Sequence, residues 1–174
     1  IYDTRGEIRY KNRLSDIVYH IGIKNSEISQ CCYPGQFVMV KVSEHYDPLL
    51  RRPLSIFRNN SEEGIIEFVF KVIGKGTKIL SEKKVGDVVN IIGPLGNSFK
   101  HNNSSEEYIF IGGGIGFPPL FFMADYIKHR SKSSIFYYGA RTKESIFFIT
   151  ELQEICDKLI LVTDDGSCGE KGLV

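Results

Sequence analysis

The sequence lacks an excess of charge and lacks a long apolar run, and each absence excludes a class of protein. Lys and Arg together number 22 and Asp and Glu number 21, so the net charge is +1. A domain that binds nucleic acid would carry a basic excess on one face, and the balance argues against that function. No apolar run approaches the roughly 20 residues that a membrane-spanning helix requires. The polar, charged segment 1–13 is unlike a signal peptide.

The sequence also lacks a cysteine or histidine pattern. Cys31 and Cys32 are adjacent, whereas Cys156 and Cys168 stand apart, so there is no Cys-x-x-Cys pair and no Cys/His spacing typical of a metal site. The four histidines are equally scattered. Free thiols are the normal state of cysteine in a reducing cytoplasm. We therefore predict a cytoplasmic protein with no metal ligand among these residues.

The chain has 174 residues, with the 42% hydrophobic and 25% charged content of an ordinary globular protein. This length allows one large domain or two small ones. The chain has no initiating Met and ends on the apolar pair Leu173-Val174. From both observations we expect a fragment of a longer protein.

The first half of the chain contains several short segments with the period of a β-strand. In one of them Ile66 and Phe68 alternate with Glu67, which indicates a strand with one apolar and one polar face. Turn signals rich in Gly and Pro separate the segments. Regular spacing of this kind is typical of an antiparallel barrel or sandwich. The expected strands are 17–24, 36–42, 64–73 and 87–93, and the expected helix is 77–84.

The second half follows a different pattern. The polar segment 101–107 is the best candidate for a linker, and after it short apolar strands alternate with amphipathic helices. Such alternation predicts a βαβαβ unit with a parallel sheet. The expected strands are 108–112, 134–139 and 159–163, and the expected helices are 117–130 and 143–156. The sequence thus predicts an all-β domain over 1–100 and an α/β domain over 108–174.

The strongest local motif is the segment 112–116, Gly-Gly-Gly-Ile-Gly, between an apolar strand and a helix. Backbone N–H groups and the helix dipole attract phosphate at such a junction, and glycine lets a ligand approach the main chain. The segment departs from the Rossmann pattern Gly-x-Gly-x-x-Gly because Phe117 occupies the third glycine position. A phosphate site and a tight turn that is glycine-rich only for packing both remain open.

A second motif, Arg51-Arg52-Pro53-Leu54-Ser55, leads into a strand. Pro53 holds Arg52 extended. A guanidinium fork suits a pyrophosphate, and the Ser55 hydroxyl can donate to a ring nitrogen. A solvated arginine pair is the alternative interpretation.

A third motif, Gly74-Lys75-Gly76-Thr77, opens the expected helix of the first half. It offers a second helix N-terminus to phosphate, and Thr77 adds a hydroxyl donor. It is not a Walker A loop, which requires Gly-x-x-x-x-Gly-Lys-[Ser/Thr].

The order of these three motifs resembles the ferredoxin–NADP reductase family of FAD- and NAD(P)-binding flavoproteins, over nearly the whole chain. The resemblance implies an FAD-binding β-barrel followed by part of a nucleotide-binding domain. It implies that the Arg and Ser of the second motif contact FAD, that the Gly-Thr pair holds its pyrophosphate, and that the end of the preceding strand makes backbone contacts. The implied FAD-binding residues are Arg52, Pro53, Leu54, Ser55, Val69, Phe70, Lys71, Gly76 and Thr77. Many members have Tyr at the position of Leu54, so a stacking aromatic is absent here.

The segments 34–38, 47–57 and 163–172 are similar to one branch of that family, the electron-transfer subunits of class 1B dihydroorotate dehydrogenases. This similarity implies an FMN-containing catalytic subunit, dihydroorotate dehydrogenase, as the partner in a hetero-oligomer. It also implies a [2Fe-2S] cluster on a C-terminal cysteine cluster, which we expect only in a segment after Val174. The small subunit of NADH-dependent ferredoxin:NADP oxidoreductase and the diaphorase subunits of some hydrogenases share the last segment and remain alternatives.

The resemblance implies the chemistry as well. FAD lies against the barrel, a nicotinamide stacks on its isoalloxazine, and hydride passes between nicotinamide C4 and flavin N5. The cofactors carry this reaction, and we assign no catalytic residue and no metal. The implied NAD(P)(H)-binding residues are Gly113, Gly114, Gly116, Gly139 and Arg141. A module that binds flavin or nucleotide without turnover is the alternative from another class.

Two questions stay open at this level. Arg141 and Lys143 suit the 2′-phosphate of NADP but also a solvated loop, so NAD and NADP are not distinguished. Asp164 and Asp165 suit a ribose, and an acidic pair that caps a turn fits the same residues.

Overall fold

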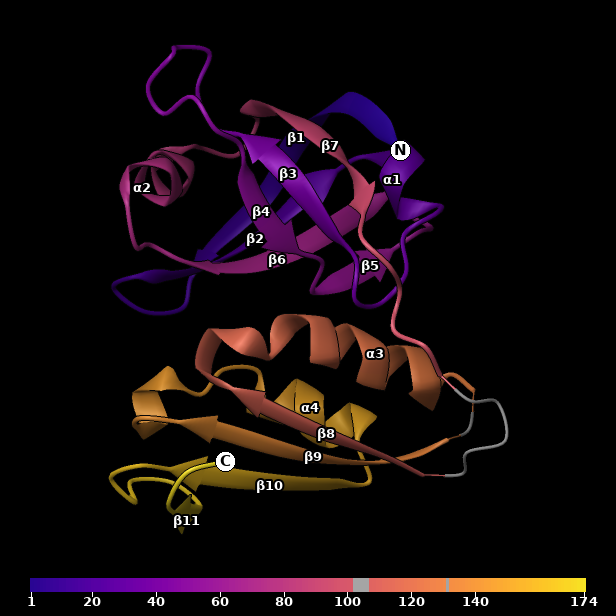
Figure 1. Ribbon diagram of the computed structural model, residues 1–174, viewed down its shortest axis with the longest axis vertical. Coiled ribbons are helices and arrows are strands. Elements are labelled where there is room, and N and C mark those ends of the chain that lie inside the picture. Colours follow the sequence, from indigo (N-terminus) through magenta and orange to yellow (C-terminus); the bar gives the residue numbers. More distant parts are fainter. Residues whose placement is uncertain (102–106, 131) are drawn as a thin grey trace. The chain divides into compact units, whose positions relative to one another are not determined.

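Figure 1 shows the computed structural model, which describes residues 1–101, 107–130 and 132–174. These residues form two compact units, 1–98 and 99–174. The predicted linker 101–107 includes residues 102–106, which lie outside the described residues.

The first unit is a seven-stranded antiparallel sheet with the strand order β4-β3-β7-β1-β2-β6-β5. It curls into a half-barrel (Figure 1), which confirms the predicted antiparallel β-barrel class. Antiparallel strands of this kind bury one face and solvate the other. The strands are β1 (Tyr2–Arg13), β2 (Val18–Lys24), β3 (Phe37–Lys41), β4 (Arg52–Ser55), β5 (Arg58–Asn60), β6 (Ile65–Lys71) and β7 (Val88–Leu95), and the helices are α1 (Ser26–Ser29) and α2 (Lys75–Glu82).

Strand β1 has no counterpart among the expected strands. Only Gly6 and Ile8 are buried in its twelve residues, so the alternating apolar signal is missing. Hydrogen-bond ladders to β2 on one side and β7 on the other hold the strand in the sheet. Its place therefore depends on backbone pairing, which hydrophobic periodicity does not report.

Strand β6 corrects the expected orientation of Glu67. The alternation predicts a solvated carboxylate, but Glu67 is buried at 6% exposure, and its Oε2 lies 2.7 Å from Nε2 of His20. His20 is itself buried at 7% exposure. A buried carboxylate needs a polar partner, and His20 on the neighbouring strand β2 supplies it.

The half-barrel stays open between β4 and β6. The chain continues from β4 into β5 through Ile56 and Phe57, and Phe57 N–H donates to the Glu67 carbonyl at 2.8 Å. Beyond Glu67, β4 and β6 lie near each other without a shared ladder among the described residues. We call this opening, between residues 52–55 and 69–71, the seam. Among the residues that the structure describes, the edge of each strand that faces the seam has no ladder partner.

The second unit is a parallel sheet with the order β11-β10-β9-β8, which confirms the predicted α/β class. Parallel neighbours need crossover connections, and α3 and α4 supply them between β8, β9 and β10. The elements are β8 (Glu107–Gly113), η1 (Gly114–Gly116), α3 (Pro118–Lys128), β9 (Ser133–Ala140), η2 (Lys143–Ser145), α4 (Ile149–Ile155), β10 (Lys158–Thr163) and β11 (Glu170–Lys171), where η1 and η2 are 3-10 turns.

Helices α3 and α4 pack on the same face of this sheet (Figure 1). On the opposite face Ile111, Tyr137 and Ile160 follow one another in register across three strands. Ile109 and Ile111 are 59% and 64% exposed. We call these four residues the open apolar face.

The expected helix 143–156 is split into η2 and α4. Helix α4 begins only at Ile149 because Phe148 has the left-handed conformation, with φ 59° and ψ 36°. This conformation brings the Phe148 ring to 6.0 Å from the Phe117 ring and 6.3 Å from the Phe121 ring, between centroids. Aromatic packing offsets a backbone conformation that costs about 1–3 kcal/mol.

Candidate functional site

Arg52 at the start of β4 and Gly76 in the first turn of α2 are in direct contact. A Cβ on residue 76 would come within 2.1 Å of Arg52 Nε and 2.7 Å of its Cζ. Only glycine leaves room for the guanidinium there. The fold thus brings together two residues that the sequence predicts to bind FAD.

Arg52 keeps hydrogen-bonding capacity beside the α2 turn, whereas Arg51 contacts the sheet. Arg52 Nη1 donates to the carbonyls of Leu50 at 2.6 Å and Arg51 at 3.3 Å. Its Nε and Nη2 donate to none of the residues that the structure describes. Arg51 Nη1 donates to the Asn90 carbonyl at 3.3 Å, and its Nη2 lies 3.8 Å from the Asp3 carboxylate. Arg51 therefore binds the sheet, and Arg52 is the member of the pair whose guanidinium lies beside the α2 turn.

The first turn of α2 offers backbone N–H groups beside this guanidinium. The first intrahelical bond runs from Lys78 N–H to the Gly74 carbonyl at 2.9 Å. The preceding amides of Lys75, Gly76 and Thr77 have no acceptor within the helix. The helix dipole adds about half a positive charge at this end, and the turn contains no acidic residue. We call the guanidinium and this turn the cationic cradle, which suits an anion such as pyrophosphate.

The Thr77 hydroxyl is predicted as a direct phosphate donor, but the structure uses it within the turn. It donates to the Gly74 carbonyl at 3.0 Å and accepts from the amides of Ile73 at 3.0 Å and Gly74 at 3.3 Å. The hydroxyl therefore shapes the turn before α2. The donor that Thr77 keeps for a ligand is its backbone N–H.

The β4 side of the seam alternates between core and solvent. Leu54 is buried at 6% exposure, whereas Pro53 and Ser55 are exposed. The Ser55 hydroxyl is thus accessible, as the predicted flavin contact requires. Leu54 packs into the core, which leaves its backbone for a ligand.

The β6 side of the seam presents backbone. The side chains of Val69 and Phe70 are buried at 6% and 3% exposure, and Lys71 is exposed. The ladder of these residues runs to β2, and β5 pairs with β6 only up to Glu67. Their other backbone edge is available for the predicted contacts.

In the second unit a cavity of about 370 Å³ lies at the carboxyl ends of the parallel strands. Ligands of open α/β sheets bind at this edge. The cavity brings together predicted NAD(P)(H)-binding residues, but Gly116 in η1 does not line it. The lining residues are Gly113, Gly114, Gly139, Ala140, Arg141, Asp164, Leu173 and Val174.

The glycines of this edge serve close approach as well as the turn. Gly113 and Gly139 are register partners on β8 and β9. A Cβ on Gly139 would lie 2.4 Å from Val174 Cγ1. Gly114 has a left-handed φ of 50°, which favours glycine. The pair forms a floor without side chains, and the Val174 side chain packs against it.

The acidic pair after β10 divides into a turn residue and a cavity residue. The Asp165 carboxylate accepts from the Ser167 amide at 2.9 Å and the Ser167 hydroxyl at 2.6 Å. The Ser167 hydroxyl and amide hold the pKa of Asp165 below its usual value. Asp164 lines the cavity. Asp165 therefore caps the turn, whereas Asp164 lines the cavity.

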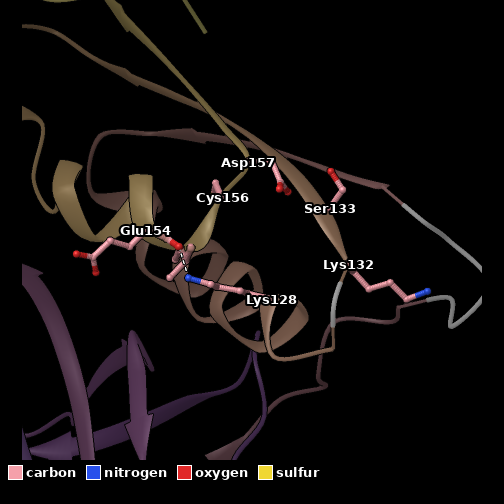
Figure 2. Close-up of a pocket in the computed structure, with 7 residues that line it drawn as sticks. Lys128, Lys132, Ser133, Glu154, Cys156 and Asp157 are labelled. Atoms are coloured by element: carbon pink, nitrogen blue, oxygen red, sulfur yellow. Dashed lines mark hydrogen bonds between the residues drawn. The ribbon is translucent and has the colours of Figure 1, made fainter.

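A second cavity of about 370 Å³ lies near the amino ends of β9 and β10 (Figure 2). Lys128 Nζ donates to the Glu154 carbonyl near the end of α4. The Asp157 carboxylate accepts from the Ser134 amide at 2.8 Å, which lowers the pKa of Asp157. These polar groups stabilise the strand and helix ends. None of the sequence-predicted site residues lines this cavity.

All four cysteines are free thiols. Burial raises the pKa of the Cys32 thiol to about 12 and raises that of Cys156. Within the described parts of the chain, no three His, Cys, Asp or Glu side chains gather as a metal site would require. The described helices include none that is long and apolar enough to cross a membrane.

A seamed antiparallel half-barrel with a cationic cradle, followed by a parallel α/β unit, is the architecture of a flavin-binding reductase. The family model of the oxidoreductase FAD-binding domain matches residues 9–100, and the chain belongs to this family. The predicted class, a ferredoxin–NADP reductase-like oxidoreductase, is thereby confirmed.

The chain is similar to two curated electron-transfer proteins. It is 39% identical over 156 residues to the dihydroorotate dehydrogenase B (NAD(+)) electron transfer subunit of Desulforamulus reducens, covering 90% of this chain and 60% of that protein. It is 37% identical over 169 residues to the electron transfer subunit homolog of Thermotoga maritima, covering 97% and 58%. The chain thus spans about three fifths of the length of these relatives.

Solved structures share the fold. The NADH-dependent reduced ferredoxin-NADP oxidoreductase superposes with a TM-score of 0.85 at 35% identity, over 96% of this chain and 59% of that chain. The ferredoxin reductase in carbazole 1,9a-dioxygenase superposes with a TM-score of 0.84 at 21% identity, over 98% and 54%. The second likeness shows the fold alone.

The residues of the cradle fit FAD, and two charged residues beside it were not predicted as site residues. The glycine that makes room for Arg52 and the free guanidinium donors match a bound pyrophosphate. Lys75 and Asp47 form an ion pair at the same turn. Lys75 lies inside the third sequence motif, and this position could have marked it as a site residue. Asp47 lies far away in sequence, and only the fold shows its place.

Proposed function

We propose that the chain is an FAD-dependent electron-transfer component that passes electrons between NAD and a partner flavoenzyme. The proposed partner is the FMN-containing catalytic subunit of a dihydroorotate dehydrogenase, bound in a hetero-oligomer. The names of the relatives from Desulforamulus reducens and Thermotoga maritima support this choice. The four free thiols support a reducing cytoplasm as the location.

The observation that carries the proposal is the Arg52–Gly76 contact in a chain of the FAD-binding family. Glycine at residue 76 keeps the guanidinium over the first turn of α2. A fork of N–H donors beside helix amides suits a pyrophosphate. FAD carries that group between its flavin and adenosine halves.

Bound FAD would supply the hydride chemistry, and the residues of the chain would bind and orient the reactants. Arg52 and the amides beside it would fix the pyrophosphate. The exposed Ser55 hydroxyl would hydrogen-bond the flavin at N5. Gly113, Gly114 and Gly116 would cradle the nicotinamide nucleotide, with Gly139 and Arg141 beside its ribose once the Val174 side chain leaves Gly139. Because the transferred group is a hydride, this arrangement needs no side-chain acid or base.

A second candidate keeps the chemistry and changes the partner. The 35% identity to the NADH-dependent ferredoxin-NADP oxidoreductase favours a subunit of such a complex, and a hydrogenase diaphorase is of the same kind. A flavin-binding module without turnover is the candidate from another class. The [2Fe-2S] cluster implied by the resemblance is not part of the proposal, because the described residues hold no ligand set for it.

The first test is reduction of the bound flavin. The protein is loaded with FAD, freed of excess cofactor and titrated anaerobically with NADH or NADPH while the visible flavin absorption is followed. We expect NADH to bleach the flavin. If FAD stays bound and neither nucleotide bleaches it, electron transfer by this chain is wrong and the binding-module hypothesis stands.

The second test identifies the partner. FAD-loaded protein is mixed with dihydroorotate, with and without an FMN-containing dihydroorotate dehydrogenase subunit. We expect flavin reduction only when that subunit is present. Reduction by reduced ferredoxin, and none by dihydroorotate with its dehydrogenase, would favour the ferredoxin complex.

A further inference from the structure

The loop between β3 and β4 is tied to the cationic cradle at two points. The Lys75 ammonium, in the first residue of α2, pairs with the Asp47 carboxylate of this loop. The Arg52 guanidinium donates to the Leu50 carbonyl of the same loop at 2.6 Å. Figure 1 shows the loop projecting beyond the end of β3, near α2. Lys75 and Arg52, the two cations beside the free amides of the α2 turn, thus both bind the β3–β4 loop.

The two ties differ in how readily a ligand can replace them. Arg52 uses only Nη1 for the Leu50 carbonyl, so its Nε and Nη2 can meet an anion without breaking that bond. Lys75 concentrates its charge on one nitrogen, so an incoming anion and the Asp47 carboxylate would meet at the same centre. The side chains of Lys75 and Asp47 are 59% and 77% exposed. An ion pair this exposed contributes about 1 kcal/mol or less, so exchange for a stronger anion costs little.

A pyrophosphate in the cradle is such an anion. It carries two negative charges, and it would meet the amides of the turn and the helix dipole as well as the ammonium. The Asp47 carboxylate meets only the ammonium. Two anions beside one lysine also repel each other. The exchange therefore favours the phosphate.

We propose that Lys75 is a second cationic ligand of the dinucleotide pyrophosphate, beside Arg52, and that Asp47 holds this ammonium until the cofactor displaces it. The inference rests on the proposed FAD binding and deepens it, because it names a contact absent from the predicted site. It also predicts the direction in which Asp47 changes the cofactor affinity: its carboxylate competes with the cofactor and lowers that affinity. A carboxylate that merely oriented Lys75 would have the opposite effect on affinity.

The test measures dissociation constants of the full chain for FAD, for ADP and for riboflavin, by calorimetry or flavin fluorescence. We expect Lys75→Gln to weaken FAD and ADP about tenfold, the loss of one charge-assisted hydrogen bond. Asp47→Asn should strengthen both about threefold, because the competing anion is removed. Neither substitution should change the affinity for riboflavin, which lacks phosphate.

Matched controls separate these contacts from net charge. Lys78→Gln removes a cation from the exposed side of the same helix, and Glu82→Gln removes an anion from its last turn. Both should leave the FAD affinity within about twofold, since screened surface charges act weakly at this range. The effect of Asp47→Asn should largely vanish in a Lys75→Gln background.

The outcomes separate this inference from the proposed function. If the unmodified chain binds FAD and Lys75→Gln binds it equally well, the lysine contact is wrong and FAD binding stands. If Asp47→Asn lowers the affinity for FAD, or raises it equally with and without Lys75, the proposed exchange of Asp47 for phosphate is wrong. If the unmodified chain fails to bind FAD, the proposed function falls and the exchange falls with it.

Discussion

The guanidinium of Arg52 occupies the space that a side chain on Gly76 would need. Gly76→Ala must therefore displace Arg52 from the α2 turn. We expect FAD affinity to fall about tenfold or more, the value of one charge-assisted contact. Stability should hold or rise by up to about 1 kcal/mol, because alanine is the better helix residue. Cofactor titration and urea unfolding measure the two effects separately.

Gly74→Ala is the matched control for that variant. A Cβ on Gly74 meets nothing within 4 Å, and its φ of −171° is open to any residue. We expect unchanged FAD affinity. Equal losses in the two variants would show that the turn as a whole, and not the contact with Arg52, sets the affinity.

The buried pair of His20 and Glu67 predicts a large stability effect. Glu67→Leu leaves the His20 ring without its carboxylate partner at 2.7 Å. Removing one partner of a buried hydrogen bond costs about 1–3 kcal/mol, because the other polar group stays buried. The double variant His20→Leu/Glu67→Leu should lose less than Glu67→Leu alone. Urea unfolding of the three proteins gives the comparison.

A surface pair provides the reference. Asp16 lies 2.8 Å from Arg13, but the two side chains are 95% and 59% exposed. We expect Asp16→Ala to change the free energy of unfolding by no more than about 0.5 kcal/mol. A loss from Glu67→Leu as small as this one would refute a structural role for the buried pair.

Buried tyrosines predict loss of stability in alkali. Burial, and then the charge and hydrogen bond of Glu67, raise the pKa of Tyr10 above 10.0. Burial raises that of Tyr138 likewise. Above about pH 10 the unfolded chain releases these protons while the folded chain keeps them, so the free energy of unfolding falls as pH rises. Below about pH 10 this contribution is present in full.

Urea unfolding between about pH 8 and about pH 11 measures the fall. Tyr10→Phe should reduce the slope of the free energy of unfolding against pH, because phenylalanine has no proton to release. Tyr46→Phe is the control, since Tyr46 is 91% exposed. An identical slope in the Tyr10→Phe variant and the unmodified chain would contradict the prediction.

The thiols should react in two classes. Cys32 and Cys156 are 7% and 9% exposed, and burial raises the pKa of both. Because thiolate is the reactive form, we expect them to react with Ellman's reagent at least about tenfold more slowly than Cys31 and Cys168, which are partly exposed. All four should react at similar rates in urea. Rapid reaction of every thiol in the folded chain would contradict the burial.

Period and turn signals predicted most elements, and their failures have a physical pattern. Strands with an apolar face, such as β2 and β6, lie within two residues of their expected positions. Strand β1 escaped because its buried positions are few and backbone ladders hold it. The helix expected over 143–156 was too long because Phe148 leaves the helical conformation to reach Phe117.

The candidate site was less predictable than the fold. Chemistry alone made Arg52 and Gly76 suitable for phosphate, but nothing in the local sequence places one against the other. Only the resemblance joined them. The contact of Asp47 with Lys75 had no sequence signal, because it depends on where the β3–β4 loop lies. Glu67 shows the same limit, since its burial depends on a partner from another strand.

The open apolar face favours association between copies of the chain. Apolar area in contact with water favours association by about 25 cal/mol for each Å² removed from it. Ile109 and Ile111 present such area on one face of β8. Repulsion between molecules normally opposes association, but a net charge of +1 supplies little of it. The solubility of this chain is therefore expected to be limited by one sheet face, and to respond to ionic additives far less than to a mild detergent.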